Sequence, residues 1–216
     1  LMLTGTQLII LFTAIISIAG FSIVSFKDRL LCKPYLIKEK NQWYRFFTSG
    51  LIHADWEHLL FNMFTLFLFG QTVENHFLTE RLFGLNGKSV YLILYISALP
   101  ISLITTYWKY NKNPRYASLG ASGAVSAVLF TAILLDPTIK IGLFILPPII
   151  PGFVFGPLYL MLSSYLGKRG KDNINHAAHI SGAIYGVIFT LAADKYVFSS
   201  PIILENFIAT IKAYLQ

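Results

Sequence analysis

Long runs of mostly apolar residues, separated by short polar loops, recur along this chain of 216 residues. A helix needs about 20 such residues to cross the hydrocarbon core of a bilayer, so runs of this length leave few alternative folds. Only 12% of the residues are charged, whereas soluble domains usually contain about 25%. The sequence therefore predicts an all-α fold for an integral, multi-pass membrane protein.

Six of the apolar runs are predicted to be membrane-spanning helices: residues 3–26, 58–77, 89–108, 119–135, 152–166 and 177–193. Four prolines interrupt the apolar sequence around the fifth run: Pro147, Pro148, Pro151 and Pro157. Each proline removes a backbone hydrogen bond and bends a helix. We therefore expect an irregular interfacial segment over residues 139–150 and a short span after it.

A single membrane domain is predicted over residues 1–196, because the chain is too short for a separate soluble module. The polar stretch 27–56, called the first loop below, contains the aromatic and basic residues that are typical of a membrane interface. Residues 197–216 form a tail with a weakly amphipathic stretch, and we expect a surface helix or a disordered segment there.

The net charge of +7 comes largely from basic residues in the loops between the apolar runs. These residues form no helical stripe and no stacking platform, so they fit a lipid surface and not a nucleic acid. Twelve of the 17 Lys and Arg residues fall in the first, third and fifth loops, which the positive-inside rule would place in the cytoplasm. The single cysteine, Cys32, excludes an internal disulfide.

Ser122 lies at the head of the predicted fourth span, inside the sequence Gly120-Ala121-Ser122-Gly123. The first turn of a helix has free backbone N–H groups and the positive end of the helix dipole, and both favour a developing anion. Gly120 and Gly123 remove side-chain bulk beside the serine, so another backbone can approach it. The alternative is a small-residue packing motif, because Gly123 and Ala127 are four residues apart.

His179 begins the sixth span and shares one helix face with Gly182 and Gly186. Two glycines on this face allow a neighbouring helix to pack closely. If that neighbour is the fourth span, Ser122 can reach His179, and the pair provides a nucleophile and its base. A proton relay and a hydrogen-bonded packing residue are the alternatives for this histidine. His176, three residues earlier, is expected to lie in the loop.

The second span begins with further polar residues. His58 and Asn62 are four residues apart on one helix face, and both can donate hydrogen bonds to a developing oxyanion. Interfacial anchoring with hydrogen bonds between helices is the alternative, which we favour for His53. The spacing from His53 to His58 differs from His-Glu-x-x-His, so no metal site is predicted. Glu74, near the far end of this span, is expected to cap a loop or to connect two spans.

Taken together, these motifs resemble those of the rhomboid intramembrane serine proteases of the six-span bacterial type, over about residues 43–186. The resemblance rests on Trp43-Tyr44-Arg45 with Thr48 in the first loop, His53, His58 and Asn62 spaced as His-x4-His-x3-Asn, Glu74, Gly120-Ala121-Ser122-Gly123, and Ala178-His179 with Gly182 and Gly186.

The resemblance implies that Ser122 is the nucleophile, that His179 is its general base, and that His58 and Asn62 help the Ser122 N–H to hold the oxyanion. It also implies structural support from Arg45, Glu74 and the four motif glycines (Gly120, Gly123, Gly182 and Gly186). Such enzymes need no cofactor, no metal and no third catalytic acid. In the family the fourth residue after the nucleophile often stacks on the catalytic imidazole. Here that residue is Ser126, so His179 must be oriented in another way.

The predicted function is therefore cleavage of the transmembrane helices of single-span membrane proteins within the lipid bilayer. The compact six-span form suggests a bacterial inner membrane, and family topology places both termini in the cytoplasm, against the charge count. One alternative is a non-catalytic rhomboid-like protein that binds membrane helices. The other is a small transporter that uses His179 and Glu74 as a proton relay, although no inverted repeat supports it.

Overall fold

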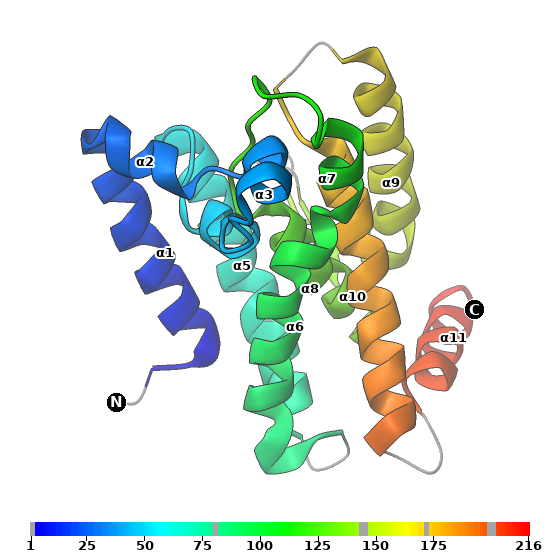
Figure 1. The fold of residues 1–216 in the computed structure, drawn as a ribbon. Coiled ribbons are helices and arrows are strands. Elements are labelled where there is room, and N and C mark those ends of the chain that lie inside the picture. The colour runs from blue at the N-terminus through cyan, green and yellow to red at the C-terminus, as the bar shows by residue number, and fades with distance from the viewer. Residues whose placement is uncertain (1–2, 80–81, 143–146, 171–172, 198–201) are drawn as a thin grey trace.

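Long helices that run roughly upright dominate the fold (Figure 1). The computed structural model describes residues 3–79, 82–142, 147–170, 173–197 and 202–216. Within these ranges the long helices are α1 (Gly5–Ser22), α5 (Trp56–Phe77), α6 (Gly87–Ser102), α8 (Ser122–Leu135), α9 (Gly152–Arg169) and α10 (His176–Val197). Three described stretches are long and apolar enough to cross a membrane: Gly5–Ser22, Gly84–Tyr110 and His176–Tyr196. The predicted all-α, polytopic membrane bundle is confirmed.

Short elements occupy the connections between the long helices. The first loop folds into α2 (Val24–Leu30), α3 (Pro34–Lys40), α4 (Arg45–Thr48) and the 3-10 helix η1 (Ser49–Leu51). Further along the chain are η2 (Gly84–Asn86), α7 (Ile104–Tyr110), the strands β1 (Lys140–Ile141) and β2 (Ile150–Pro151), and α11 (Ile203–Tyr214). Helices α2, α3 and α7 lie at the upper end of the bundle in Figure 1.

Several predicted boundaries differ from the observed ones. The first predicted span breaks at Ile23, whose extended backbone (φ −122°, ψ 94°) separates α1 from α2. The predicted irregular segment 139–150 is partly regular, because β1 and β2 pair antiparallel with Lys140 opposite Pro151. Residues 143–146 of that segment lie outside the described residues, as do residues 198–201 of the tail. Helix α9 begins directly after Pro151 and continues through Pro157.

Helix α8 lies at the centre of the bundle, where it contacts α5, α6, α9, α10 and α11. All of its residues from Gly123 to Leu134 are buried, as expected for a helix that is apolar on every face. Its 14 residues span only about 21 Å at 1.5 Å per residue. A bilayer core is about 30 Å thick, so one end of α8 lies below the membrane boundary.

The packing of α8 against α10 depends on two glycines of α10. A Cβ atom on Gly182 would overlap the carbonyl oxygen of Gly123, and one on Gly186 would overlap that of Ala127. At the next turns, the Thr131 hydroxyl donates to the Gly186 carbonyl at 3.2 Å and lies 3.0 Å from the Thr190 hydroxyl. The fourth and sixth predicted spans are therefore neighbours with their backbones in contact.

Glu74 connects α5 to the beginning of α1. Its carboxylate is 3% exposed and accepts hydrogen bonds from the Gly5 N–H (2.6 Å), the Thr6 N–H (2.9 Å) and the Thr6 hydroxyl (2.9 Å). The first N–H groups of a helix have no partners within that helix. An acceptor with negative charge at this position both satisfies them and interacts favourably with the helix dipole.

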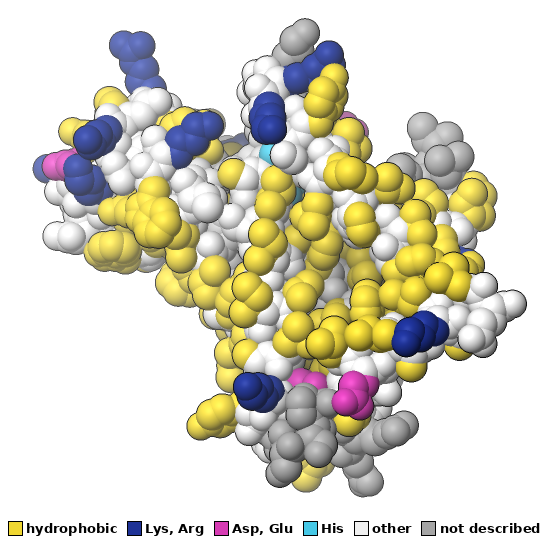
Figure 2. All heavy atoms as spheres, turned by 90° about the vertical axis from the view of Figure 1, so that its right-hand side faces the viewer, with side chains coloured by type: hydrophobic (Ala, Val, Ile, Leu, Met, Phe, Trp, Pro, Cys, Tyr) yellow, Lys and Arg dark blue, Asp and Glu magenta, His cyan; other side chains and the backbone are white. Residues whose placement is uncertain are grey.

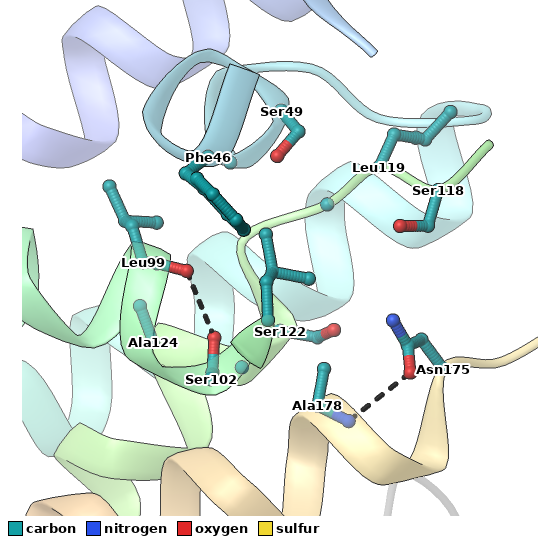
Figure 3. Close-up of a pocket in the computed structure, with 14 residues that line it drawn as sticks. Phe46, Ser49, Leu99, Ser102, Ser118, Leu119, Ser122, Ala124, Asn175 and Ala178 are labelled. Atoms are coloured by element: carbon teal, nitrogen blue, oxygen red, sulfur yellow. Dashed lines mark hydrogen bonds between the residues drawn. The ribbon is translucent and has the colours of Figure 1, made fainter. Parts of the chain in front are cut away.

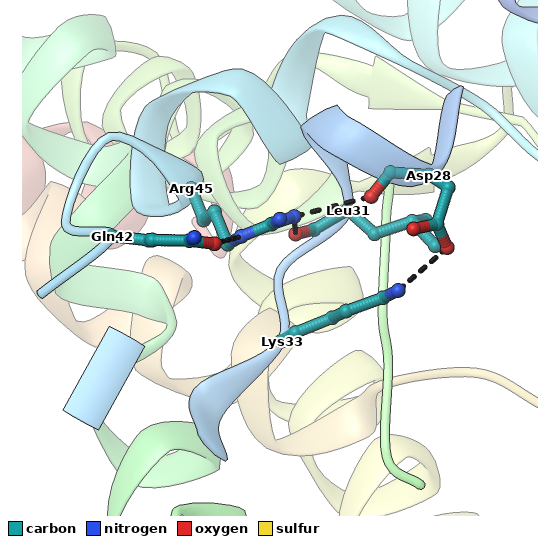
Figure 4. Close-up of polar contacts among 5 residues, drawn as sticks. All are labelled: Asp28, Leu31, Lys33, Gln42 and Arg45. Atoms are coloured by element: carbon teal, nitrogen blue, oxygen red, sulfur yellow. Dashed lines mark hydrogen bonds and ion pairs between the residues drawn. The ribbon is translucent and has the colours of Figure 1, made fainter. Parts of the chain in front are cut away.

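Arg45 is buried within the first loop and holds its parts together (Figure 4). Its guanidinium donates to the Gln42 side chain (2.6 Å) and to the backbone carbonyls of Leu31 (2.8 Å) and Asp28 (3.2 Å). The Asp28 carboxylate in turn forms an ion pair with Lys33 at 2.6 Å. The turn between α2 and α3 is thereby fixed against α4.

Candidate active site

The backbone that leads to Ser122, called the nucleophile loop (residues 118–121), is hydrogen-bonded to the first loop along its length. Ser118 and Cys32 exchange two backbone hydrogen bonds of 2.9 and 3.0 Å. The Gly120 N–H donates to the Ser49 carbonyl at 2.9 Å. The Ala121 N–H donates to Nε2 of His53 at 3.4 Å. These hydrogen bonds to the first loop therefore fix the position of the backbone directly before Ser122.

Ser122 is the first residue of α8, and its side chain is partly exposed although the following residues are buried. Its backbone N–H is one of the N–H groups that a helix leaves without internal partners. Within the described part of the chain, no side chain caps this end of α8. These N–H groups and the helix dipole are thus available to an anion that forms next to the serine hydroxyl.

Gly120 allows the His58 ring to lie against the nucleophile loop. Its φ of +110° is strained for any residue with a side chain. A Cβ atom at this position would lie 2.6 Å from the His58 ring. Asn62, one turn further along α5, is 2% exposed and donates its amide to the His58 backbone carbonyl at 2.9 Å. The structure therefore places the His58 ring next to the nucleophile loop, and the Asn62 side chain bonds back to the His58 backbone.

His53 is 1% exposed and lies between α1, α5 and the nucleophile loop. Its Nδ1 is 2.9 Å from the Ser17 hydroxyl, which itself donates to the Leu51 carbonyl at 2.9 Å. Because Nε2 accepts from the Ala121 N–H, the ring is neutral and its proton belongs on Nδ1. Burial lowers the pKa of His53 from 6.5 to about 3, with a further contribution from His58.

The histidine that the sequence singles out, His179, lies in the first turn of α10, next to the beginning of α8. Its neighbour Ala178 has its carbonyl oxygen 3.3 Å from the position that a Gly123 Cβ would occupy. The expectation that His176 lies in a loop is wrong, because it is the first residue of α10 and only 6% exposed. Its ring makes an edge contact with the His179 ring, with centroids 5.9 Å apart.

Tyr159 of α9 makes a second ring contact with His179. The two rings are nearly parallel, with an interplanar angle of 19° and centroids 6.3 Å apart. The Tyr159 hydroxyl is 2.9 Å from the hydroxyl of Ser126. One tyrosine thus touches both the helix that carries Ser122 and the helix that carries His179.

A small pocket opens beside Ser122, between α4, α6, the nucleophile loop and the beginning of α10 (Figure 3). Its polar lining includes Ser49, Ser102, Ser118 and Asn175. Asn175 accepts from the Ala178 N–H at 3.2 Å and so caps the beginning of α10. A pocket with several hydroxyl groups can hold water near the serine, which hydrolysis of a covalent intermediate requires.

Metal chemistry receives no support from the described residues, because no three His, Cys, Asp or Glu side chains among them are grouped as a metal site would require. The chemistry available at Ser122 is therefore that of a hydroxyl, an imidazole and hydrogen-bond donors.

The sequence did not identify the contact of His53 with Ala121 or the contacts of Tyr159 with Ser126 and His179. For Tyr159 a signal existed, because the serine at position 126 implied that another group orients the imidazole. For His53 the motif spacing marked the residue, but its contact with Ala121 joins positions 68 residues apart. Such a contact depends on how the loops meet, which the local sequence does not encode.

Comparisons with known proteins connect this arrangement to one family. The rhomboid domain family model matches residues 40–195. Rhomboid-like protein 11 of Arabidopsis thaliana, a chloroplastic protein, is 30% identical over 179 residues, which are 79% of this chain and 60% of that protein. The rhomboid protease GlpG of Haemophilus influenzae is 30% identical over 167 residues, which are 77% of this chain and 78% of that protein.

A third relative, the rhomboid protease AarA of Providencia stuartii, is 26% identical over 173 residues, or 73% of this chain and 58% of that protein. The chain spans about half to three fifths of the length of the Arabidopsis and Providencia relatives. The matched region includes residues 40–56 of the first loop, the nucleophile loop and the helices that carry Ser122 and His179. Because the family model matches well over half of its residues, this chain belongs to the rhomboid family of membrane proteins.

Proposed function

We propose that this chain is an intramembrane serine endopeptidase that cleaves the transmembrane segments of single-span membrane proteins with a Ser122–His179 dyad. The observation that carries the proposal is the direct contact of α8 and α10 at Gly123 and Gly182, which brings the beginnings of both helices together. Ser122 and His179 lie in the first turns of these two helices.

In the proposed reaction, the Ser122 oxygen attacks the scissile carbonyl carbon and His179 takes the serine proton. The carbonyl oxygen becomes an oxyanion, which the backbone N–H groups at the beginning of α8 and the side chains of His58 and Asn62 would stabilise. The C–N bond then breaks, and the leaving amine receives the proton from His179. Water attacks the resulting ester with His179 again as base, which releases the second product and restores the serine.

The proposed substrates are helices that unwind near the cleavage site, because a carbonyl in an intact helix is already hydrogen-bonded. Access from the side of α9 is part of the proposal. Helix α9 contains Pro157, and its outer face exposes Leu158, Met161, Leu162 and Tyr165. A helix with this apolar outer face is suited to contact a substrate helix in the bilayer.

The relatives support a membrane protein and, in two cases, a protease by name. They come from chloroplasts, mitochondria and bacteria. The comparisons therefore support residence in a membrane and do not favour the bacterial inner membrane that the compact form had suggested.

The test is cleavage of a single-span reporter protein by the purified chain in detergent. We expect the wild type to cleave it, and Ser122→Ala and His179→Ala to reduce the rate by at least about 10⁴-fold, as for other dyads and triads. The matched controls are Ser89→Ala, an exposed serine, and His76→Ala, at the far end of α5. Both should cleave at the wild-type rate.

Equal cleavage by the wild type and Ser122→Ala would show that the dyad is not the site. Absence of cleavage by every variant, together with copurification of the intact reporter, would favour the non-catalytic helix-binding alternative.

A further inference from the structure

We propose that Tyr159 of α9 is a positioning residue that orients the His179 imidazole, and that its hydrogen bond to Ser126 holds it in place. This inference rests on the proposed function, since orientation of the imidazole matters only if His179 acts as a base. Residue 126, four positions after Ser122, is a serine and has no ring to stack on the imidazole. The inference assigns this stacking to a residue of α9 instead.

The first observation is the stacking of the Tyr159 ring on the His179 ring. At 19° the Tyr159 and His179 planes are almost parallel, and the 6.3 Å separation of their centroids is that of an offset stack. A ring on one face of an imidazole restricts its rotation about χ2, which is otherwise a broad torsion. The edge contact from His176 limits the imidazole from a second direction.

The second observation is the hydrogen bond between the Tyr159 and Ser126 hydroxyls. Ser126 is 3% exposed and four residues after Ser122, so the two serines lie on the same face of α8. The Tyr159 hydroxyl, 2.9 Å from Ser126, is therefore anchored one turn below the nucleophile. Phe130, one further turn along α8, contacts the Tyr159 ring with centroids 5.7 Å apart. These two contacts fix both ends of the tyrosine against α8.

Tyr159 belongs to a different helix from Ser126 and from His179. The tyrosine belongs to α9, whereas its hydrogen bond to Ser126 reaches α8 and its ring contact with His179 reaches α10. Gly156, one turn earlier, faces Phe130 of α8, and a Cβ atom there would lie 3.5 Å from that ring. If α9 moves away from α8, the stack on His179 is lost with it. Orientation of the base is thus coupled to the position of α9.

The test separates orientation of the base from entry of the substrate. A small fluorophosphonate reacts with an activated serine: the serine oxygen bonds to phosphorus, fluoride leaves, and the proton passes to the base. This probe needs no helix to enter past α9. We measure its labelling rate, and kcat and KM for a single-span reporter, on the purified full chain with Tyr159→Leu, Tyr159→Phe and Ser126→Ala.

We expect Tyr159→Leu to slow both labelling and kcat by about 10- to 100-fold, the range for a misplaced catalytic group, with KM unchanged. Tyr159→Phe keeps the ring and loses the hydrogen bond, so a loss of about 2- to 10-fold is expected. The Tyr159 hydroxyl is also hydrogen-bonded to Ser163, so Ser126→Ala removes only one of its bonds and should cost no more than Tyr159→Phe. The double variant should be no slower than Tyr159→Phe alone. Tyr196→Leu, the same change at a 94% exposed position near the far end of α10, is the control.

Wild-type labelling by a folded Tyr159→Leu chain would overturn the inference alone, and a rise in KM without a fall in labelling would make Tyr159 a substrate contact instead. A wild-type chain that neither labels nor cleaves would overturn the proposed function and the inference with it. If Tyr159→Leu does not fold, the comparison of Tyr159→Phe with Ser126→Ala decides, because a larger loss for Ser126→Ala than for Tyr159→Phe contradicts an effect that acts through the Tyr159 hydroxyl.

Discussion

At the scale of single residues, His53 shows how a buried neutral histidine can position a backbone. It accepts from the Ala121 N–H, directly before Ser122, and its other nitrogen faces Ser17 of α1. Protonation of Nε2 would convert this acceptor into a donor and would place a charge in a buried site. The low pKa of His53, about 3, reflects this burial.

This pKa predicts a dependence of stability on pH. The unfolded chain binds the proton near pH 6.5 and the folded chain only near pH 3, so stability is fully present above pH 6.5 and falls as the pH drops toward 3. The slope expected from this one group is about 1.4 kcal/mol per pH unit. The measurement is thermal unfolding in detergent between pH 3 and 8, for wild type and His53→Gln.

His53→Gln keeps a donor and an acceptor but does not titrate. Its stability should therefore fall less steeply than that of the wild type over this range. Parallel curves for the two proteins would contradict the assigned neutral state.

Some residues of the candidate site can be predicted from the sequence, and others cannot. Ser122, His179 and His58 could be proposed as site residues from the sequence, because the motifs that contain them are local and lie at helix ends. The placement of Tyr159 could not be proposed, because stacking across α9 and α10 depends on how three helices pack. The same is true of Asn62. The motif marks this residue, but it does not specify that the side-chain amide donates to the His58 carbonyl.

At the scale of elements, the contact of α8 with α10 should be the least tolerant of added volume. We predict that Gly182→Ala destabilises the fold by about 1–3 kcal/mol or more, because its Cβ meets the Gly123 backbone, which cannot move aside like a side chain. The matched control is Gly156→Ala in α9, where the nearest atom is 3.5 Å away in the Phe130 side chain.

Gly156→Ala should be neutral or stabilising by up to about 1 kcal/mol, because alanine is the better helix former. Unfolding in a mixed detergent titration measures both variants. Equal destabilisation by the two substitutions would show that the α8–α10 contact is not especially close.

The helices themselves were largely predictable, because apolar length marks a span. The break at Ile23 was not, since it falls inside a continuous apolar run and is set by the turn into the first loop. The pairing of β1 with β2 was missed for a related reason. Prolines indicate where a helix cannot continue, but they do not reveal that the flanking residues meet as strands.

At the scale of the whole molecule, basic side chains are concentrated at one end. Figure 2 shows Lys and Arg side chains gathered mainly at the upper end, isolated basic and acidic side chains lower down, and hydrophobic side chains over the middle of that face. Four cations of the first loop have partners there: Arg45 on the Leu31 and Asp28 carbonyls, Lys33 on the Asp28 carboxylate, Lys38 on Glu39, and Lys27 on the Ala54 carbonyl. Arg81 and Lys171 lie outside the described residues.

Cations that are held inside a folded loop have less effect on orientation than cations that meet lipid headgroups. We therefore predict the family orientation, with the first loop on the side away from the cytoplasm. The chain offers a clean assay, because Cys32 is fully buried and burial raises the pKa of its thiol to about 11.

A membrane-impermeant maleimide should label Lys112→Cys, in the exposed third loop, in intact cells. It should label Leu85→Cys, at the fully exposed opposite end, only after lysis. The wild type, unlabelled until it is denatured, is the control. The reverse pattern would mean that the positive-inside count decides the orientation.

The short length of α8 has a consequence for the products of the proposed reaction. If the far end of α8 lies at one boundary, a 21 Å helix leaves Ser122 about 9 Å below the other, a depth of about six residues of substrate helix. A cut at that depth divides a 20-residue span unequally. One fragment keeps about 14 apolar residues and stays anchored, whereas the other keeps about six and is free to leave for water. The length of one buried helix would thus decide which half of a substrate is released as a soluble protein.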